Sequence, residues 1–467
     1  MLFSSISFLY YFLPATLLLY FLAPKKLKNT VLLLASLFFY AWGEQKLVVL
    51  FAGTILVGWV FGRLIEKFHK KRAVSAAFLW LSIILNIAVL GYFKYADFFI
   101  TGINSLFGIS LPLLRITLPI GISFYMFQII SYTIDVYRRT VPARKNLIDF
   151  GAYVACFPQL IAGPIVRYSD IAVQLKNRIH TAEKIASGIR RFLIGLGKKV
   201  LIANAFGELI VLFRSTQDSS VLYYWLYAVS FTLQIYYDFS GYSDMAIGLG
   251  KILGFEFMEN FNYPYISKSI TEFWRRWHIS LGSWFRDYVY IPLGGNKKGI
   301  SRQLFNILVV WALTGLWHGA AMNFVLWGLF FAILLIFEKL GLKKIVEHHP
   351  VMGHAYTLFT VVLGFVLFNA SSLTQALNDL LSLFGGRNLP LVSSEAIYYL
   401  RSYAVLFIIA IIGSTPVPKN LMTRMKKKKE SSTILFLLET IFLLNLLLIC
   451  TAYLVDGSFN PFLYFRF

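Results

Sequence analysis

The sequence contains few charged residues and only two cysteines. Asp, Glu, Lys and Arg make up 14% of the 467 residues, whereas soluble globular domains carry about 25%. Cys156 and Cys450 both lie in apolar stretches, which excludes a disulfide framework and a cysteine-based metal site. The scarcity of charge excludes an ordinary soluble fold.

The short motifs of several enzyme classes are also absent. The sequence has no H-E-x-x-H, no P-loop and no G-x-S-x-G. Neither a zinc protease, nor nucleotide-driven transport, nor a hydrolase triad therefore has support. Acidic residues are scarce in the apolar segments, so we expect no metal site and no bound cofactor.

What the sequence does contain is a series of long charge-free segments. They lie at residues 1–24, 73–93, 151–166, 219–237, 303–337 and 402–418. A membrane-spanning helix needs about 20 apolar residues, or about 17 at the short end, and the mean hydropathy is +0.67. The sequence predicts an all-α polytopic membrane protein in which residues 1–467 form a single membrane domain.

Basic residues predict the orientation of the spans. The net charge is +22, and such an excess is typical of cytoplasmic loops, which also meet anionic lipid; no segment resembles a nucleic-acid-binding module. No basic residue precedes the first apolar stretch, which favours an uncleaved first span that starts outside. With every basic cluster in the cytoplasm, both termini lie outside, and simple spans fall near residues 7–23, 30–43, 46–62, 73–93, 116–134, 191–213, 221–238, 354–370, 401–415 and 432–455.

Three segments are not simple spans. Residues 303–337 are charge-free but basic at both flanks, which predicts a hairpin or re-entrant pair that bends at Gly315 and Gly319, with His318 at the turn. Residues 147–166 form a second candidate re-entrant segment. Residues 269–288 begin with a capping-box pattern and carry apolar residues at steps of three and four, which predicts an interfacial amphipathic helix with His278 along its apolar side.

Two histidines are the candidates for chemistry. His318 lies within the charge-free segment, where an ionisable side chain is costly and indicates function. Burial favours its neutral form, and a neutral imidazole beside a hydroxyl is the usual general base. The alternative is a structural histidine bonded to a carbonyl at a helix break. His278 lies among tryptophans, a setting that is more often packing than catalysis.

Two carboxylates in an apolar segment also need an explanation. Asp238 and Asp244 either line a polar cavity or, as we favour, pair with an arginine such as Arg275 or Arg276.

Several strings around these residues resemble the membrane-bound O-acyltransferase (MBOAT) family, and within it the membrane subunits of bacterial alginate O-acetyltransferases. The histidine-bearing strings and their neighbours are FWRRWHISL (273–281), WFRDY (284–288), YIPLGGN (290–296) and GLWHGA (315–320). Supporting strings are LPIGISFY (118–125), FPQLIAGPI (157–165), DFSGYSD (238–244) and NPFLYF (460–465).

The resemblance implies a fold and a set of site residues. The fold would be a ring of about 11 transmembrane helices with re-entrant segments and interfacial amphipathic helices around a central funnel. His318 would be the catalytic histidine, and His278 the second signature histidine of the same channel. We expect the substrate channel also to include Trp274, Trp277, Arg275, Arg276, Arg286, Asp287, Trp317, Asn323, Asp238 and Asp244.

The resemblance also implies a reaction. A membrane-embedded O-acyltransferase of the bacterial inner membrane would take an acyl group, most simply acetyl, from a cytoplasmic thioester, either acetyl-CoA or an acyl carrier. His318 would deprotonate the acceptor or an intermediate carrier, Arg275, Arg276 and Arg286 would meet the anionic donor, and Asn323 would stabilise the oxyanion. The acceptor would be an exported polysaccharide, reached through an extracytoplasmic acetyltransferase or esterase-like partner.

Other functions remain open at this point. Within the family, the alternatives are D-alanyl transfer to teichoic acid and peptidoglycan O-acetylation. Outside it, the alternative is a polysaccharide exporter or flippase, since transporters also bury polar groups at broken helices. A sugar pathway needs many intramembrane polar side chains, whereas this sequence concentrates its polar chemistry around two histidines and a few carboxylates.

Overall fold

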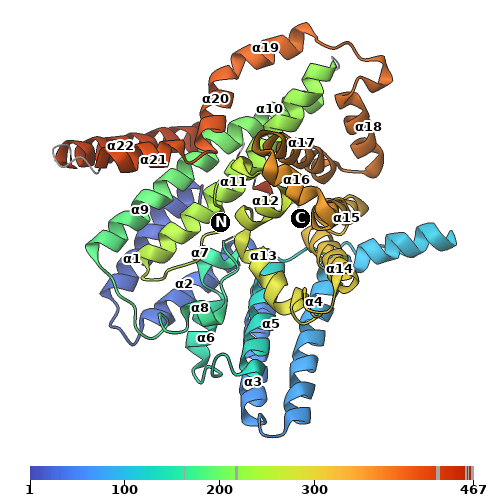
Figure 1. Cartoon of the computed structure of the whole chain (residues 1–467). Helices are drawn as coiled ribbons and strands as arrows, with labels where there is room; N and C mark the ends of the chain where they lie inside the picture. The colour runs from blue at the N-terminus through green and yellow to red at the C-terminus, as the bar shows by residue number, and fades with distance from the viewer. Residues whose placement is uncertain (162, 216–218, 427–431, 458–459, 461, 464–467) are drawn as a thin grey trace. The chain divides into compact units, whose positions relative to one another are not determined.

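The computed structural model describes the whole chain except residues 162, 216–218, 427–431, 458–459, 461 and 464–467 (Figure 1). The described residues form helices and no β-strand. They divide into two compact units, one of Met1–Phe192 with Ser243–Met258 and the other of Leu193–Tyr242 with Glu259–Phe467. The single membrane domain expected from the sequence stays a prediction. Parts of the 460–465 string and of the last basic cluster lie outside the described residues.

The first unit contains the N-terminal apolar helices. The spans predicted near 7–23, 30–43, 46–62 and 73–93 are confirmed as helices, and the one near 116–134 becomes helical only from Ile122. The segment 147–166 is broken into two short, buried helices, α6 and α7. The helices are η1 (Ser7–Phe12), α1 (Leu13–Leu22), α2 (Lys28–Gly43), α3 (Leu47–Lys67), α4 (Arg72–Phe107), α5 (Ile122–Arg138), α6 (Leu147–Val154), α7 (Phe157–Leu160), α8 (Tyr168–Ile171) and α9 (Ala182–Gly197).

The second unit contains both candidate histidines. Its central helix α11 (Val221–Ile252) continues into the first unit. The other helices are η2 (Lys198–Ala203), α10 (Asn204–Ser215), η3 (Pro264–Ile266), α12 (Ile270–Arg276), α13 (Ile279–Phe285), η4 (Arg286–Tyr290), α14 (Ile300–His318), α15 (Met322–Phe337), η5 (Glu338–Leu342), α16 (Lys343–His348), α17 (Pro350–Asn369), α18 (Leu373–Leu383), η6 (Gly386–Asn388), α19 (Ser394–Ser402), α20 (Ala404–Gly413), α21 (Val417–Lys426) and α22 (Ser432–Asp456).

The apolar helices are those of a multi-pass membrane protein. Among the described residues, six helices are long and apolar enough to cross a bilayer, or up to seven if α19 and α20, bent by 57°, form one span. Their lengths agree with the roughly 20 residues that a span requires. The all-α polytopic class predicted from the sequence is confirmed.

The charge-free segment forms the predicted hairpin. Helix α14 ends at His318, three residues reverse the chain, and α15 packs back along α14. The predicted bend position was partly wrong, because α14 runs straight through Gly315 and the reversal starts at Gly319. Each arm is long enough to span, since the second helical run continues to His348.

Gly315 explains how closely the two arms of this hairpin approach. A Cβ added at Gly315 would overlap the carbonyl oxygen of Phe324, which is backbone and cannot rotate away. The Gly315→Ala protein should therefore lose about 1–3 kcal/mol of stability, as overpacked cores do, and acyl transfer should fall because His318 ends the same helix. Thermal melting in detergent and the transfer rate measure the two effects. Gly91→Ala is the matched control, because a Cβ at Gly91 meets nothing within 4 Å; equal melting temperatures for the two variants would contradict this account.

The segment 269–288 differs from the single amphipathic helix that its pattern predicted. Ser269 does cap α12, since its hydroxyl accepts the N–H of Glu272 at 3.1 Å. However, the helix stops at Trp277, and His278 adopts a left-handed backbone conformation with φ 44°. Helices α13 and η4 follow. The apolar residues of this segment, which recur at steps of three and four, pack into the second unit. Most of the large side chains of the segment are therefore buried.

Candidate active site

His318 lies in a buried aromatic setting at the C-terminal end of α14. Its side chain is 7% exposed. Its ring centroid lies 5.0 Å from that of Trp327 and 5.2 Å from that of Phe368. The C-terminal end of a helix favours positive charge, so this position stabilises the imidazolium that would form when His318 takes a proton.

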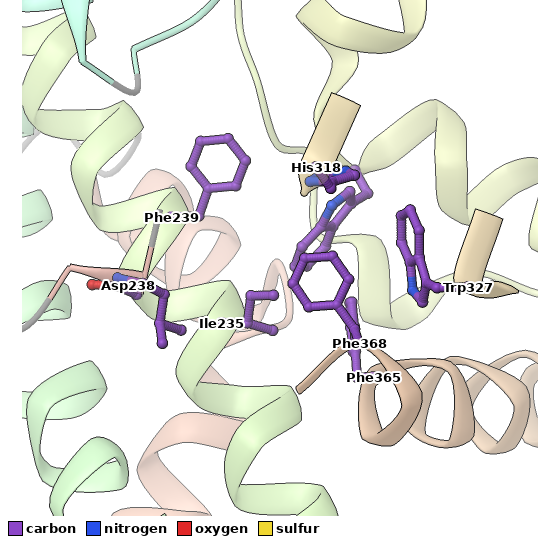
Figure 2. A pocket seen from close by; sticks show the side chains of 9 residues that line it. Ile235, Asp238, Phe239, His318, Trp327, Phe365 and Phe368 are labelled. Carbon is purple, nitrogen blue, oxygen red and sulfur yellow. The ribbon is translucent and has the colours of Figure 1, made fainter. Parts of the chain in front are cut away.

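A small cavity lies on one side of His318. Its volume is about 10 Å³, which is room for a single water-sized group. Figure 2 shows the aromatic residues gathered near His318, with Asp238 and Phe239 of α11 on the other side of the cavity. The lining residues are Ile235, Asp238, Phe239, Trp277, His318, Trp327, Phe365, Phe368 and Leu463.

A much larger cavity contains both histidines. Its volume is about 580 Å³, which is the size of a small-molecule site. His278 and His318 line it together with Arg275 and Arg286. The cavity therefore combines two imidazoles with two cations that suit an anionic ligand. Its lining also includes Trp274 and Trp277, as expected from the sequence.

His278 is held deep in the protein. Its side chain is 3% exposed, and its ring packs edge-on against Phe239 with centroids 4.7 Å apart. Its Nδ1 lies 3.0 Å from Oδ1 of Asn260. Trp317 lies between the two histidines, with ring centroids 5.9 Å from His278 and 5.0 Å from His318. The histidines belong to one aromatic cluster at one cavity.

The other predicted channel residues do not all reach this cavity. Arg276 instead binds Glu272 at 2.9 Å, and Asp287 binds Arg286 at 2.7 Å beside the cavity. Asn323 donates to the carbonyl oxygen of Ala370 at 2.9 Å and is not part of the cavity lining.

Both embedded carboxylates are paired, as we favoured, but with partners other than those suggested. Asp238 binds Lys199 at 2.6 Å, and Asp244 binds Arg191 at 2.9 Å within the first unit. The pairing with Arg275 or Arg276 was therefore wrong. Lys199 is the second residue of the π-helical turn η2, a feature whose register cannot be read from apolar periodicity.

Three other residues of the site were missed in the sequence. Asn260 contacts His278, Leu463 lines the small cavity, and Glu338 accepts the N–H groups of Ile270 and Thr271 at 2.6 and 2.8 Å, which caps α12. Each belongs to a segment far along the chain from its partner. The position of Glu338 directly after the charge-free segment 303–337 was the only signal in the sequence.

The burial of His278 predicts a pH-dependent stability. Burial lowers the pKa of His278 from 6.5 to about 3, so below pH 6.5 the unfolded chain binds a proton that the folded protein does not. Stability should therefore fall as the pH decreases from 6.5, by up to about 1.4 kcal/mol per pH unit. Melting in detergent between pH 5 and 8 should show a shallower decrease for His278→Gln than for the wild type. His69→Gln, at an exposed position, should keep the wild-type slope; identical slopes for all three proteins would contradict the burial effect.

Comparisons with known proteins identify the family of this chain. A family model of MBOAT, the membrane-bound O-acyltransferase family, matches residues 66–376. The chain is 46% identical to a probable alginate O-acetylase of Pseudomonas putida over 381 residues, which is 80% of this chain and 79% of the relative. It is 34% identical to a peptidoglycan O-acetyltransferase of Helicobacter pylori over 442 residues, covering 86% and 83%.

A more distant similarity involves a teichoic acid D-alanyltransferase of Bacillus subtilis, at 29% identity over 270 residues, 54% of this chain and 68% of the relative. The chain belongs to the membrane-bound O-acyltransferase family. It is a multi-pass membrane O-acyltransferase.

Proposed function

We propose that this protein moves an acetyl group from a cytoplasmic thioester donor to hydroxyl groups of an exported cell-envelope polysaccharide. The observation that carries the proposal is the cavity of about 580 Å³ that His278, His318, Arg275 and Arg286 line together. The volume of the cavity suits the acyl-thioester end of the donor, and its two arginines suit an anionic carrier. The high identity to probable alginate O-acetylases supports acetyl as the acyl group and a polysaccharide as its destination.

The chemistry requires a base and positioning, because a thioester is already activated. Neutral His318 removes the proton from the acceptor hydroxyl as its oxygen attacks the acyl carbon. The C–S bond breaks, the C–O bond forms, and the imidazolium returns the proton to the departing thiolate. The C-terminal end of α14 stabilises the imidazolium in between. In this scheme Arg275 and Arg286 bind the anionic part of the donor.

The finer features of the architecture are part of the proposal. We infer a ring of about 11 transmembrane helices with re-entrant segments around a central funnel, in the bacterial inner membrane, with both termini outside. The basic clusters between the predicted spans support this orientation. An extracytoplasmic acetyltransferase or esterase-like partner would then pass the acetyl group to the polymer.

The cellular acetyl content of exported glycans tests the function. A strain without the protein is complemented with the wild type or with His318→Ala, and base-labile acetate is measured on purified extracellular glycans and on peptidoglycan. We expect acetate on the extracellular polysaccharide to be lost in the deletion and in the His318→Ala strain. Loss from peptidoglycan alone would support the alternative suggested by the Helicobacter relative, and unchanged acetylation with a well-expressed variant would refute the proposal.

The remaining alternatives have measurable signatures too. D-alanyl transfer, suggested by the Bacillus relative, would appear as lost D-alanine esters. An exporter or flippase would change the amount of external polymer and leave its acetyl content per sugar intact.

A further inference from the structure

Asn260 makes an unusual set of contacts with the segment that carries His278. Its side chain is fully buried, with 0% exposure. Its Oδ1 lies 3.0 Å from Nδ1 of His278, 3.2 Å from the backbone N of Ser280 and 2.9 Å from the Ser280 hydroxyl. Its backbone carbonyl accepts the N–H of Ile279 at 3.0 Å. One residue, 18 positions before His278, thus holds three consecutive residues.

These contacts determine which atom of the amide faces the imidazole. The backbone N–H of Ser280 is a donor and nothing else, so the amide atom that it meets must be the oxygen. A carbonyl oxygen can only accept. The Nδ1 atom of His278 therefore carries the hydrogen and donates it to Asn260. A neutral imidazole with hydrogen on Nδ1 has its lone pair on Nε2.

The backbone around His278 is held by the same loop. His278 is a non-glycine residue in the left-handed region, with φ 44° and ψ 53°, which costs of order 1 kcal/mol or more and is typical of functional positions. The N–H of Asn262 also binds the carbonyl of Arg276 at 2.9 Å. The stretch from Asn260 to Asn262 thus hydrogen-bonds to the chain on both sides of the break between α12 and α13.

We infer that Asn260 is a positioning residue that fixes His278 in the tautomer whose Nε2 accepts a hydrogen bond from a group bound in the large cavity. The inference rests on the proposed function, because it gives the second histidine a defined part in the same reaction. Without the Oδ1 acceptor, the imidazole loses the contact that selects its tautomer and its ring orientation. The neutral form is then divided between two tautomers, and only one of them offers Nε2.

Two substitutions distinguish positioning from a merely structural role. Asn260→Ala removes the acceptor, whereas Asn260→Asp keeps an oxygen at the same place and adds a negative charge. If Asn260 only filled space, a buried carboxylate would be at least as harmful as alanine, because burying a charge is costly. If Asn260 positions His278, aspartate should preserve the tautomer and the activity, and its charge should favour the protonated imidazole.

The assay uses inverted membrane vesicles that contain the full-length protein, with radiolabelled acetyl-CoA and cytosolic extract. We expect Asn260→Ala to lower the maximal rate about 100-fold, the lower end of what acid–base groups contribute, with an unchanged KM for the donor. The maximal rate of Asn260→Asp should stay within about tenfold of the wild-type rate at pH 8. The acid limb of its pH–rate profile should move to higher pH by about one unit or more, because an adjacent negative charge favours the protonated imidazole. The ionisable groups near this ring are Asp238, paired with Lys199, and Arg275, Arg286 and His318, which line the same cavity. Of these, Asp238, Arg275 and Arg286 are the same in the wild type and in both Asn260 variants.

Asn262→Ala is the matched control. Asn262 lies two residues away and its side chain is exposed, and the hydrogen bonds that it makes with Arg276 use only its backbone groups. Its rate and pH profile should equal those of the wild type. A wild-type rate for Asn260→Ala would overturn the inference, as would an Asn260→Asp protein that is no more active than Asn260→Ala and has an unshifted acid limb. His318→Ala in the same vesicles tests the proposed function separately from the role of Asn260. If His318→Ala abolishes transfer while both Asn260 variants behave as the wild type, the proposed function is supported and the positioning role of Asn260 is refuted.

Discussion

Replacing His318 by alanine should lower the rate of acyl transfer by about 10³-fold or more. General acid–base catalysis contributes about 10²–10⁴-fold, and removing the ring also removes the charge that the end of α14 stabilises. The substitution leaves a space beside the cavity of about 580 Å³, which free imidazole can enter. Added imidazole should therefore restore part of the activity of His318→Ala in membrane vesicles.

Two further variants make this prediction specific to the base. His318→Phe fills the space with an aromatic ring that has no nitrogen, so imidazole should not restore its activity. His69→Ala, at an exposed position, should behave as the wild type with or without imidazole. A His318→Ala protein that retains a tenth of the normal rate would show that another group removes the proton.

Breaking the buried ion pair between Lys199 and Asp238 should produce the largest loss of stability. The two side chains are 2% and 3% exposed, and their charged atoms lie 2.6 Å apart. Removing one partner leaves the other charge buried without this ion pair, which costs about 3–5 kcal/mol. Lys199→Met and Asp238→Leu should each lower the melting temperature markedly, whereas the double variant should recover most of the loss, because both charges are then gone.

The same pair should also affect the site, because Asp238 has a second contact. Its Oδ2 accepts the backbone N–H of Leu463 at 2.8 Å, and Leu463 lines the small cavity next to His318. The double variant is thus expected to melt near the wild-type temperature and yet transfer acyl groups more slowly, since Leu463 has lost its acceptor. Additive melting losses in the double variant would contradict a direct ion pair. Arg63→Ala, which breaks a partly exposed pair with Glu66, should change the melting temperature little.

Much of the fold could be predicted because membrane helices follow simple rules. A helix must bury about 20 apolar residues in lipid, so the charge-free segments marked helices, for example at residues 73–93 and 303–337. The hairpin around His318 followed from the basic flanks of a segment too long for one span. His318 was singled out for a related reason, since an ionisable group in such a segment is costly unless it has a function, whereas His278 entered through the family resemblance.

Other features could not be predicted because they depend on partners distant in the chain. At the break of the amphipathic segment, Asn260 bonds to His278 and Ile279. The partners of Asp238 and Asp244 are set by packing and are not the arginines that we favoured. Local patterns specify apolar faces and helix starts, but they carry no information on which distant group meets a buried charge.

The lengths of the apolar segments and the positions of the charged residues were thus enough to define an all-helical membrane protein with an ionisable residue at the bend of a hairpin. The reason is that the cost of placing a charge in lipid depends on where the residue lies along an apolar segment, which the sequence shows directly. The tertiary structure decided that His278 and His318 line one cavity and that Lys199, Asn260 and Glu338 support it. Those contacts join residues that are separated by 18 to 68 positions in the chain, and only the packing of the helices brings them within hydrogen-bonding distance.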